Sequence, residues 1–165
     1  AAASHPDDNG SPGGAGLMRA GGGRAKGAAY EREICKLIEL ATGRKLRRRL
    51  SQYQEKNLSD LEPADNKPFP FLIECKRYAS GVSPKWWDQI VTAAKSAANT
   101  NDALPCLIYK LDRQQTQVRI PIQALVVLGD SSVAQDIAET YDWRYTATLD
   151  WETFEMVLRE HLAVM

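Results

Sequence analysis

The segment Phe69–Ile73 is the feature that most limits how this chain can fold. Its residues read Phe-Pro-Phe-Leu-Ile, which is apolar on both faces and predicts a strand at the centre of the sheet, covered on both sides. Helical patterns flank it, because apolar residues recur at helical spacing over 28–42, and Ser83 followed by Pro84 is a cap before a first-turn proline. We therefore expect an α/β fold with a mixed central β-sheet flanked by helices.

The other elements follow from local patterns. Gly43 is expected to cap the first helix, and 44–50 to be a loop that leads into an edge strand. Further strands are predicted over 57–61, 104–111, 117–120, 124–128 and 145–149. Further helices are predicted over 132–141 and 151–162. The resulting order is αβββαβ, followed by β, α, β and α.

The first 27 residues differ from the rest of the chain. They hold eight of its eleven glycines and almost nothing apolar, so they cannot offset the entropy cost of ordering. We expect a disordered leader over 1–27, in which residues 1–17 are a cloning remnant ahead of a natural start at Met18. Residues 28–165 are expected to form a single domain, with a core over 28–122 and an acidic C-terminal extension over 123–165.

The charge is balanced in total but unevenly distributed. Lys+Arg and Asp+Glu both number 21, yet residues 19–57 hold 11 basic and 4 acidic residues, and residues 127–165 hold 2 and 8. A basic region in a neutral protein indicates one face that binds an anion, for which nucleic acid is the obvious candidate. A solvated helix face is the alternative. The acidic end has three open interpretations: a dimer surface, a cover against non-specific DNA, or an extension of the sheet.

Several classes of function are excluded by composition. The three cysteines contain no CxxC pair, which favours reduced thiols over a disulfide scaffold or zinc cage. The two histidines are His5, in the leader, and His161, near the end, so chemistry that needs a histidine base is not expected. The apolar stretch 124–128 is too short to span a membrane, and we expect a cytoplasmic protein. If this is an enzyme, carboxylates and lysine must do the chemistry.

Glu74, Cys75 and Lys76 end the apolar strand. Because side chains alternate along a strand, Glu74 and Lys76 share one face and Cys75 lies on the other. Asp60 lies fourteen residues before Glu74, with a turn-rich stretch between them, and two strands joined this way can form a hairpin that brings both carboxylates together. Such a pair suits Mg²⁺. The alternatives are a salt bridge at the rim of the sheet for Glu74 and Lys76, and a turn-forming or surface acid for Asp60.

Glu31 is a third candidate carboxylate. It precedes Ile34 by three residues and Ile38 by seven, which puts it on the inward face of the first helix. A buried carboxylate is costly unless it has a cation or hydrogen-bond donors. We expect a metal-site role for it, in preference to an ion pair with Arg32 or Lys26.

Basic and aromatic residues near these carboxylates predict contact with DNA. Lys85 precedes Trp86 and Trp87; one tryptophan is expected in the core and the other has the chemistry to stack on an unpaired base, although packing of both is favoured. The residues expected to bind phosphates, with salt-sensitive affinity and without sequence readout, are Arg24, Lys26, Arg44, Lys45, Arg47, Arg48, Arg49 and Lys85.

Three motifs together resemble the PD-(D/E)xK nuclease superfamily. They are Lys26-Gly27 with Glu31 on the opening helix, Asp60, and Glu74-Cys75-Lys76. Within the superfamily the chain is similar to archaeal-type Holliday-junction resolvases and their phage relatives, over about residues 24–111. Two departures are serine instead of proline before Asp60, and an arginine displaced to Arg24.

The resemblance implies a restriction-endonuclease-like fold and a metal-dependent mechanism. Asp60, Glu74 and the Cys75 carbonyl would hold Mg²⁺, for which Mn²⁺ can substitute, and Glu31 would complete the site directly or through a water. Lys76 would orient the attacking water or, with its pKa lowered by partial burial, deprotonate it. Related recombination nucleases carry Q-x-x-x-Y on the next helix. Here Gln89 matches and position 93 is alanine, so Gln89 is either a catalytic contact to phosphate or metal water, or a plain surface residue.

We therefore expect a Mg²⁺-dependent, structure-selective endodeoxyribonuclease of a phage or its prokaryotic host. Its expected substrate is a four-way DNA junction formed in recombination, cut by a homodimer whose two-fold symmetry places two sites on two strands. One alternative is a phage or mobile-element nuclease acting on linear ends, flaps or specific sites. The other is a non-catalytic DNA-binding relative.

Overall fold

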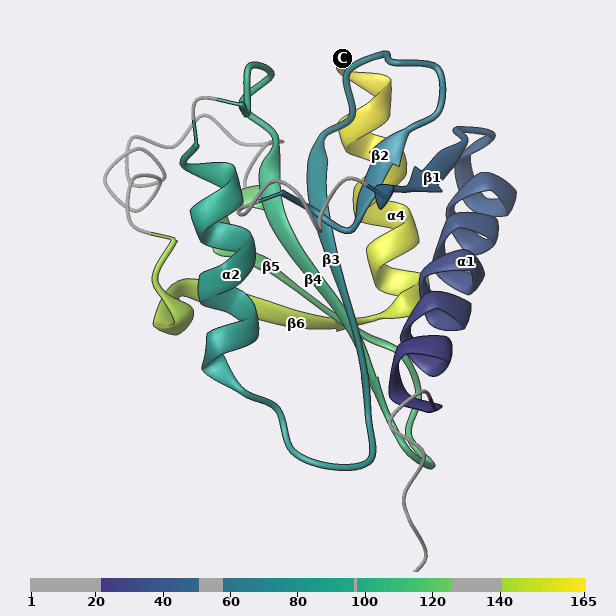
Figure 1. The fold of residues 1–165 in the computed structure, drawn as a ribbon. Helices are drawn as coiled ribbons and strands as arrows, with labels where there is room; N and C mark the ends of the chain where they lie inside the picture. The colour runs from purple at the N-terminus through teal and green to yellow at the C-terminus, as the bar shows by residue number, and fades with distance from the viewer. Residues whose placement is uncertain (1–21, 51–57, 97, 126–140) are drawn as a thin grey trace, which may run out of the picture.

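The computed structural model describes residues 22–50, 58–96, 98–125 and 141–165 (Figure 1). Its helices and strands follow one another in the order α1 (Gly22–Thr42), β1 (Leu46–Arg48), β2 (Leu61–Pro63), β3 (Phe71–Tyr78), α2 (Pro84–Ala94), β4 (Leu104–Leu111), β5 (Gln117–Pro121), the 3-10 helices η2 (Ile122–Leu125) and η3 (Trp143–Tyr145), β6 (Thr146–Asp150) and α4 (Trp151–Ala163).

The main sheet has four strands in the order β3-β4-β5-β6. Strands β3 and β4 are parallel, joined by a crossover through α2, whereas β5 is antiparallel to both β4 and β6. Strands β1 and β2 form a separate antiparallel pair, with Leu46 opposite Pro63. The expected mixed α/β fold is confirmed. The expected central position of the apolar strand is wrong, since β3 ends the four-stranded sheet.

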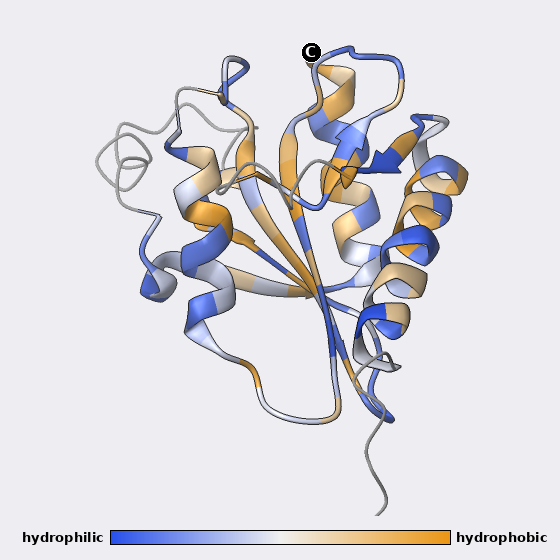
Figure 2. Cartoon of the chain, in the orientation of Figure 1, coloured by the Kyte–Doolittle hydropathy of each residue, from blue (hydrophilic) through white to orange (hydrophobic). Residues whose placement is uncertain are grey.

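Both faces of β3 are nevertheless covered. Ile73 belongs to the larger apolar cluster, which lies between the sheet and helices α1 and α4. Leu72 packs against a second cluster, built around Trp87 and Ile90 of α2. Figures 1 and 2 show α2 on one side of the sheet and α1 with α4 on the other, with apolar residues concentrated on the strands between them.

Three predicted boundaries change. Helix α1 begins at Gly22, so residues 22–27 are helical and do not belong to a disordered leader; an ion pair between Lys26 and Asp112 ties this first part of the helix to the sheet. The strand expected over 57–61 is wrong for residues 58–60, which lie outside any strand, and only Leu61 belongs to β2. Where a strand over 124–128 was expected, η2 ends at Leu125, because Ala124 is buried and its carbonyl contacts His161 Nε2 at 2.8 Å.

Some expectations fall outside the described residues: the leader over 1–21, the remainder of 124–128, and the predicted helix 132–141 up to residue 140. Among the helices that the structure describes, none is sufficiently long and apolar to cross a membrane.

The acidic C-terminal region is built into the core. Strand β6 extends the sheet beside β5, and Phe154 and Leu158 of α4 are fully buried in the larger cluster. Of the three interpretations left open, the structure supports an extension of the sheet.

Phe154→Ala should therefore lower the free energy of unfolding by about 3–5 kcal/mol, because it leaves a cavity under α4. Chemical denaturation monitored by circular dichroism measures this. Met156→Ala, on the exposed side of the same helix, is the control and should change stability by less than about 0.5 kcal/mol. A small effect at Phe154 would contradict a shared core.

Candidate active site

The second half of β3 carries two charged side chains on the face that α2 covers. Glu74 is 1 % exposed, and its Oε1 atom lies 2.6 Å from Lys76 Nζ. The same ammonium donates a 3.1 Å hydrogen bond to Gln89 Oε1 on α2. Gln89 therefore lies beside Lys76, and its side chain is also exposed to solvent.

Asp60 is held against β3 by two hydrogen bonds. Its backbone N–H donates to the Ile73 carbonyl at 2.9 Å, and its carboxylate Oδ2 accepts from the Cys75 N–H at 2.7 Å. The side chain is buried. The segments that carry Asp60 and Glu74 are thus close together, as predicted. The predicted hairpin is not formed, because β2 pairs with β1, and Asp60, the residue before β2, makes the hydrogen bonds to β3.

The electrostatics of Glu74 favour a bound cation. Burial, followed by repulsion from the Asp60 carboxylate, raises the pKa of Glu74 to about 8. Oε1 is engaged by the Lys76 ammonium, and the Asp60 carboxyl lies within hydrogen-bonding reach of the Glu74 carboxyl. Two adjacent buried carboxylates are the hard oxygen ligands that Mg²⁺ binds. A bound cation would offset the free-energy cost of burying their charges and the repulsion between them. These residues therefore fit a divalent metal.

Lys76 differs from one expectation. Burial favours the neutral amine and acts to lower its pKa, but the neighbouring Glu74 and Asp60 carboxylates outweigh this and raise the pKa above its ordinary value. Beside these two charged carboxylates the side chain is an ammonium, which can orient and polarise a neighbouring water or phosphate. The lowered pKa that a role as general base requires is not found, because the two carboxylates lie so close.

Glu31 lies near this site but is paired elsewhere. Its carboxylate makes an ion pair with Arg48 of β1. The alternative considered from the sequence was a pair with Arg32 or Lys26. The Cys75 thiol is close enough to feel the charges of these acids. Its pKa is raised by burial first, and then by Asp60, Glu74 and Glu31. The charges of all three acids therefore act on the Cys75 thiol, although only Asp60 is hydrogen-bonded to this residue, through its backbone N–H. In the described part of the chain, however, no three acidic, histidine or cysteine side chains come close enough to form a metal cluster.

Most of the basic residues predicted to bind DNA are paired with carboxylates. Glu62 contacts both Arg47 and Arg49, at 2.8 and 3.1 Å. The other pairs are Lys26 with Asp112, Arg44 with Asp65, Lys45 with Glu39 and Arg48 with Glu31. Arg24 and Lys85 are exposed at the starts of α1 and α2. The strongly basic segment is therefore largely neutralised, which its charge count did not reveal because Glu62, Asp65 and Asp112 lie outside it.

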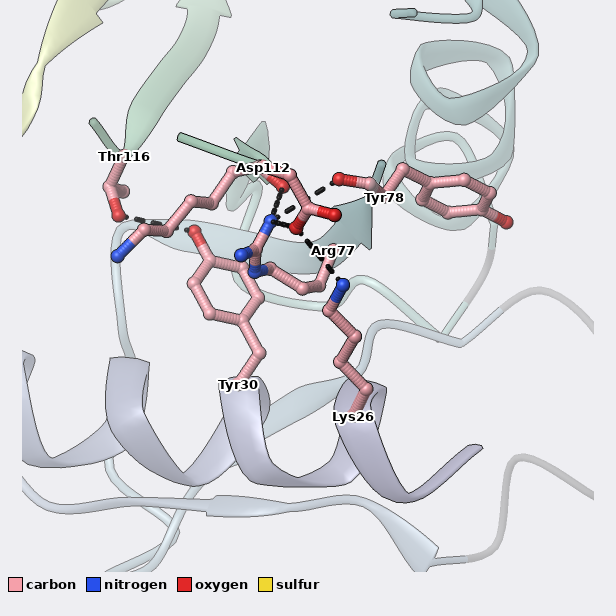
Figure 3. Close-up of polar contacts among 7 residues, drawn as sticks. Lys26, Tyr30, Arg77, Tyr78, Asp112 and Thr116 are labelled. Atoms are coloured by element: carbon pink, nitrogen blue, oxygen red, sulfur yellow. Dashed lines mark hydrogen bonds and ion pairs between the residues drawn. The ribbon is translucent and has the colours of Figure 1, made fainter. Parts of the chain in front are cut away.

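Arg77 and Asp112 form a network that the sequence did not indicate. Asp112 Oδ1 lies 2.7 Å from Arg77 Nη1 and 3.0 Å from Lys26 Nζ, and Tyr30 donates a 3.4 Å hydrogen bond to Thr116 nearby (Figure 3). These contacts join the first turns of α1 to the ends of β3 and β4. Beside them opens a pocket of about 400 Å³ lined by Gly23, Gly27, Cys75, Lys76, Arg77, Tyr78 and Ala79.

Comparisons with known proteins show which family the chain matches. The family described as "Phage putative PDDEXK endonuclease" matches residues 22–163. Among solved structures, Hjc of Archaeoglobus fulgidus, a Holliday junction resolvase from an archaeal hyperthermophile, is 19% identical with a TM-score of 0.42; the alignment covers 69% of this chain and 99% of that chain. No curated protein matches. The family match includes α1, the β3 site and the C-terminal helix.

Proposed function

Because the chain belongs to this family of PDDEXK endonucleases, we propose that it is a Mg²⁺-dependent endodeoxyribonuclease that hydrolyses phosphodiester bonds in branched DNA. The observation that carries the proposal is the buried Glu74 carboxyl group, which lies against the Asp60 carboxylate and the Lys76 ammonium and whose pKa is raised to about 8. Such a combination is costly for a protein to maintain unless the site is used.

The metal ligands would be Asp60, Glu74 and the Cys75 carbonyl, with Glu31 completing the site directly or through a water. When bound, Mg²⁺, or Mn²⁺ in its place, would supply positive charge to the phosphoryl group and to the attacking water. The ligands lie on a rigid frame, because Asp60 is fixed to β3 through the Ile73 carbonyl and the Cys75 N–H.

Lys76 and Gln89 would act on the water and the phosphate. The ammonium has a Gln89 hydrogen bond on one side and Glu74 on the other, so its position is defined before substrate binds. From there it donates hydrogen bonds to the attacking water or to a phosphate oxygen and stabilises the negative charge that develops in the transition state. Hydrolysis with the geometry implied by the family resemblance leaves a 5′-phosphate and a 3′-hydroxyl.

The substrate that we propose is a four-way DNA junction in the host cytosol, cut by a homodimer. The exposed Arg24 and Lys85 would contact phosphates directly. The paired residues Lys26, Arg44, Lys45, Arg47, Arg48 and Arg49 would contribute where their cationic groups remain accessible, which makes the affinity decrease with salt.

The test compares a synthetic four-way junction with a linear duplex of matching sequence. With Mg²⁺, we expect the junction to be nicked at least about tenfold faster, because two-fold related sites can engage two strands together. Denaturing gels of end-labelled strands measure both rates. Equal rates would reject junction selectivity and retain nuclease activity.

Gln89 supports a second candidate, because related recombination nucleases place a glutamine on this helix and here it contacts Lys76. In that case the protein would act on linear ends or flaps. Progressive degradation of an end-labelled duplex in the same experiment would favour this candidate, whereas binding without any cleavage would indicate a non-catalytic relative.

A further inference from the structure

Tyr78 and Trp86 form an aromatic pair beside the proposed site, in which Tyr78 is exposed and Trp86 is half-buried. Their ring centroids are 4.7 Å apart with an interplanar angle of 37°, and Tyr78 is 49 % exposed. Trp86 also packs against the buried Tyr109, at 6.4 Å between centroids. The pair is therefore supported from below by the core and open to solvent above.

This pair repeats the arrangement of the proposed catalytic pair. Lys76 on β3 contacts Gln89 on α2, and Tyr78 on β3 contacts Trp86 on α2. Tyr78 follows Lys76 by two residues, which puts both on one face of the strand about 6.6 Å apart. Trp86 and Gln89 are three residues apart and therefore neighbours on the helix. The aromatic pair and the Lys76–Gln89 pair are thus neighbours in the space between β3 and α2.

The surroundings suit nucleic acid better than an apolar protein partner. Lys85 is exposed immediately before Trp86, and Lys76 lies on the inner side of the pair. The acidic Asp112 is bound to Arg77, whose side chain lies on the opposite face of β3; in Figure 3 the Tyr78 ring points away from that network. A flat aromatic surface with cationic neighbours is the combination that single-stranded DNA recognises.

We propose that Tyr78 and Trp86 stack an unpaired base of the DNA strand, next to the phosphodiester bond that is cut. The inference rests on the proposed function, and it defines the substrate class further: the nucleotide beside the cut is unpaired, as in a gap or flap, or where the base pair at the branch point of a junction opens. A base inside a continuous duplex is covered by its neighbours and does not reach the pair.

The test removes the Tyr78 ring from the protein and the bases from the DNA, separately and together. Wild type and Tyr78→Ala are each titrated, in EDTA to prevent hydrolysis, with a duplex containing a short single-stranded gap and with the same duplex carrying abasic sites in the gap. We expect Tyr78→Ala to weaken binding to the gapped duplex by about 5- to 100-fold, measured by fluorescence anisotropy. On the abasic duplex the two proteins should bind alike.

Two variants serve as controls. Tyr78→Phe keeps the ring and should bind the gapped duplex like wild type, whereas Tyr145→Ala removes a comparably exposed tyrosine, 43 % exposed, from a different part of the surface and should have no effect. Thermal melting checks that Tyr78→Ala is folded. Equal weakening of Tyr78→Ala on both duplexes would overturn the stacking assignment.

The outcomes also separate this inference from the proposed function. Base-dependent binding by a protein that fails to cleave any DNA in Mg²⁺ would support stacking and refute the nuclease. Cleavage without base-dependent binding would support the nuclease and refute stacking.

Discussion

DNA cleavage in Mg²⁺ should fall by about a hundredfold to a thousandfold when Asp60 is replaced by asparagine or Lys76 by methionine. Asparagine keeps an oxygen that can accept the hydrogen bond from the Cys75 N–H but removes the charge that we propose binds metal. Methionine keeps most of the lysine's volume and removes the ammonium between Glu74 and Gln89. Neither change removes the basic residues that we propose bind the flanking phosphates, so most of the binding in EDTA should persist.

Single-turnover cleavage of a four-way junction measures the loss, and anisotropy in EDTA measures binding. Asp142→Asn is the matched control, because Asp142 pairs with Arg144 in η3, at a place to which we assign no role in the site. It should cleave at the wild-type rate. Wild-type cleavage by Asp60→Asn or Lys76→Met would show that the site has been assigned to the wrong residues.

Glu74→Gln should stabilise the protein in EDTA by about 1–3 kcal/mol at pH 7 while removing its stabilisation by Mg²⁺. The pKa of Glu74 is raised from 4.5 to about 8, mainly by burial and then by Asp60. The folded state thus holds a proton that the unfolded state releases at lower pH. This contribution to stability is complete below about pH 4.5 and is lost as the pH rises to about 8.

Denaturation of both proteins in EDTA between pH 5 and pH 8 tests the sign: wild type should lose stability relative to Glu74→Gln as the pH rises. Added Mg²⁺ should raise the melting temperature of wild type, because a ligand of the folded state stabilises it, and leave that of Glu74→Gln unchanged. Glu152→Gln, an exposed acid on α4, is the control and should respond to Mg²⁺ like wild type. Equal stabilisation of Glu74→Gln by Mg²⁺ would remove Glu74 from the metal site.

Local patterns were sufficient for most of the fold. Strand β4 covers the predicted residues, and α4 begins at the predicted Trp151 and extends one residue beyond Leu162. The alternation that places Glu74 and Lys76 together on one face of β3 also holds. These features succeed because a strand or helix repeats over a few residues, so apolar periodicity and a cap are visible within a short window.

Longer-range features were harder to predict. Position 124 is apolar and was expected in a strand, yet Ala124 lies in η2 and its carbonyl contacts His161 of α4. The start of α1 was also missed, since glycine-rich residues have low helix propensity and their helix is tied to the sheet through Lys26 and Asp112. In both cases a contact with a distant element outweighs the local preference.

By itself the sequence determined the order of the elements, the covered apolar strand and the positions of the acids and lysine that resemble a nuclease site. Tertiary structure alone decided which charges meet: Glu31 with Arg48, Glu62 with two arginines, and Lys76 with carboxylates that keep it protonated. The physical reason is that ionic interactions depend on distance and burial in space, whereas helices and strands arise from neighbours along the chain.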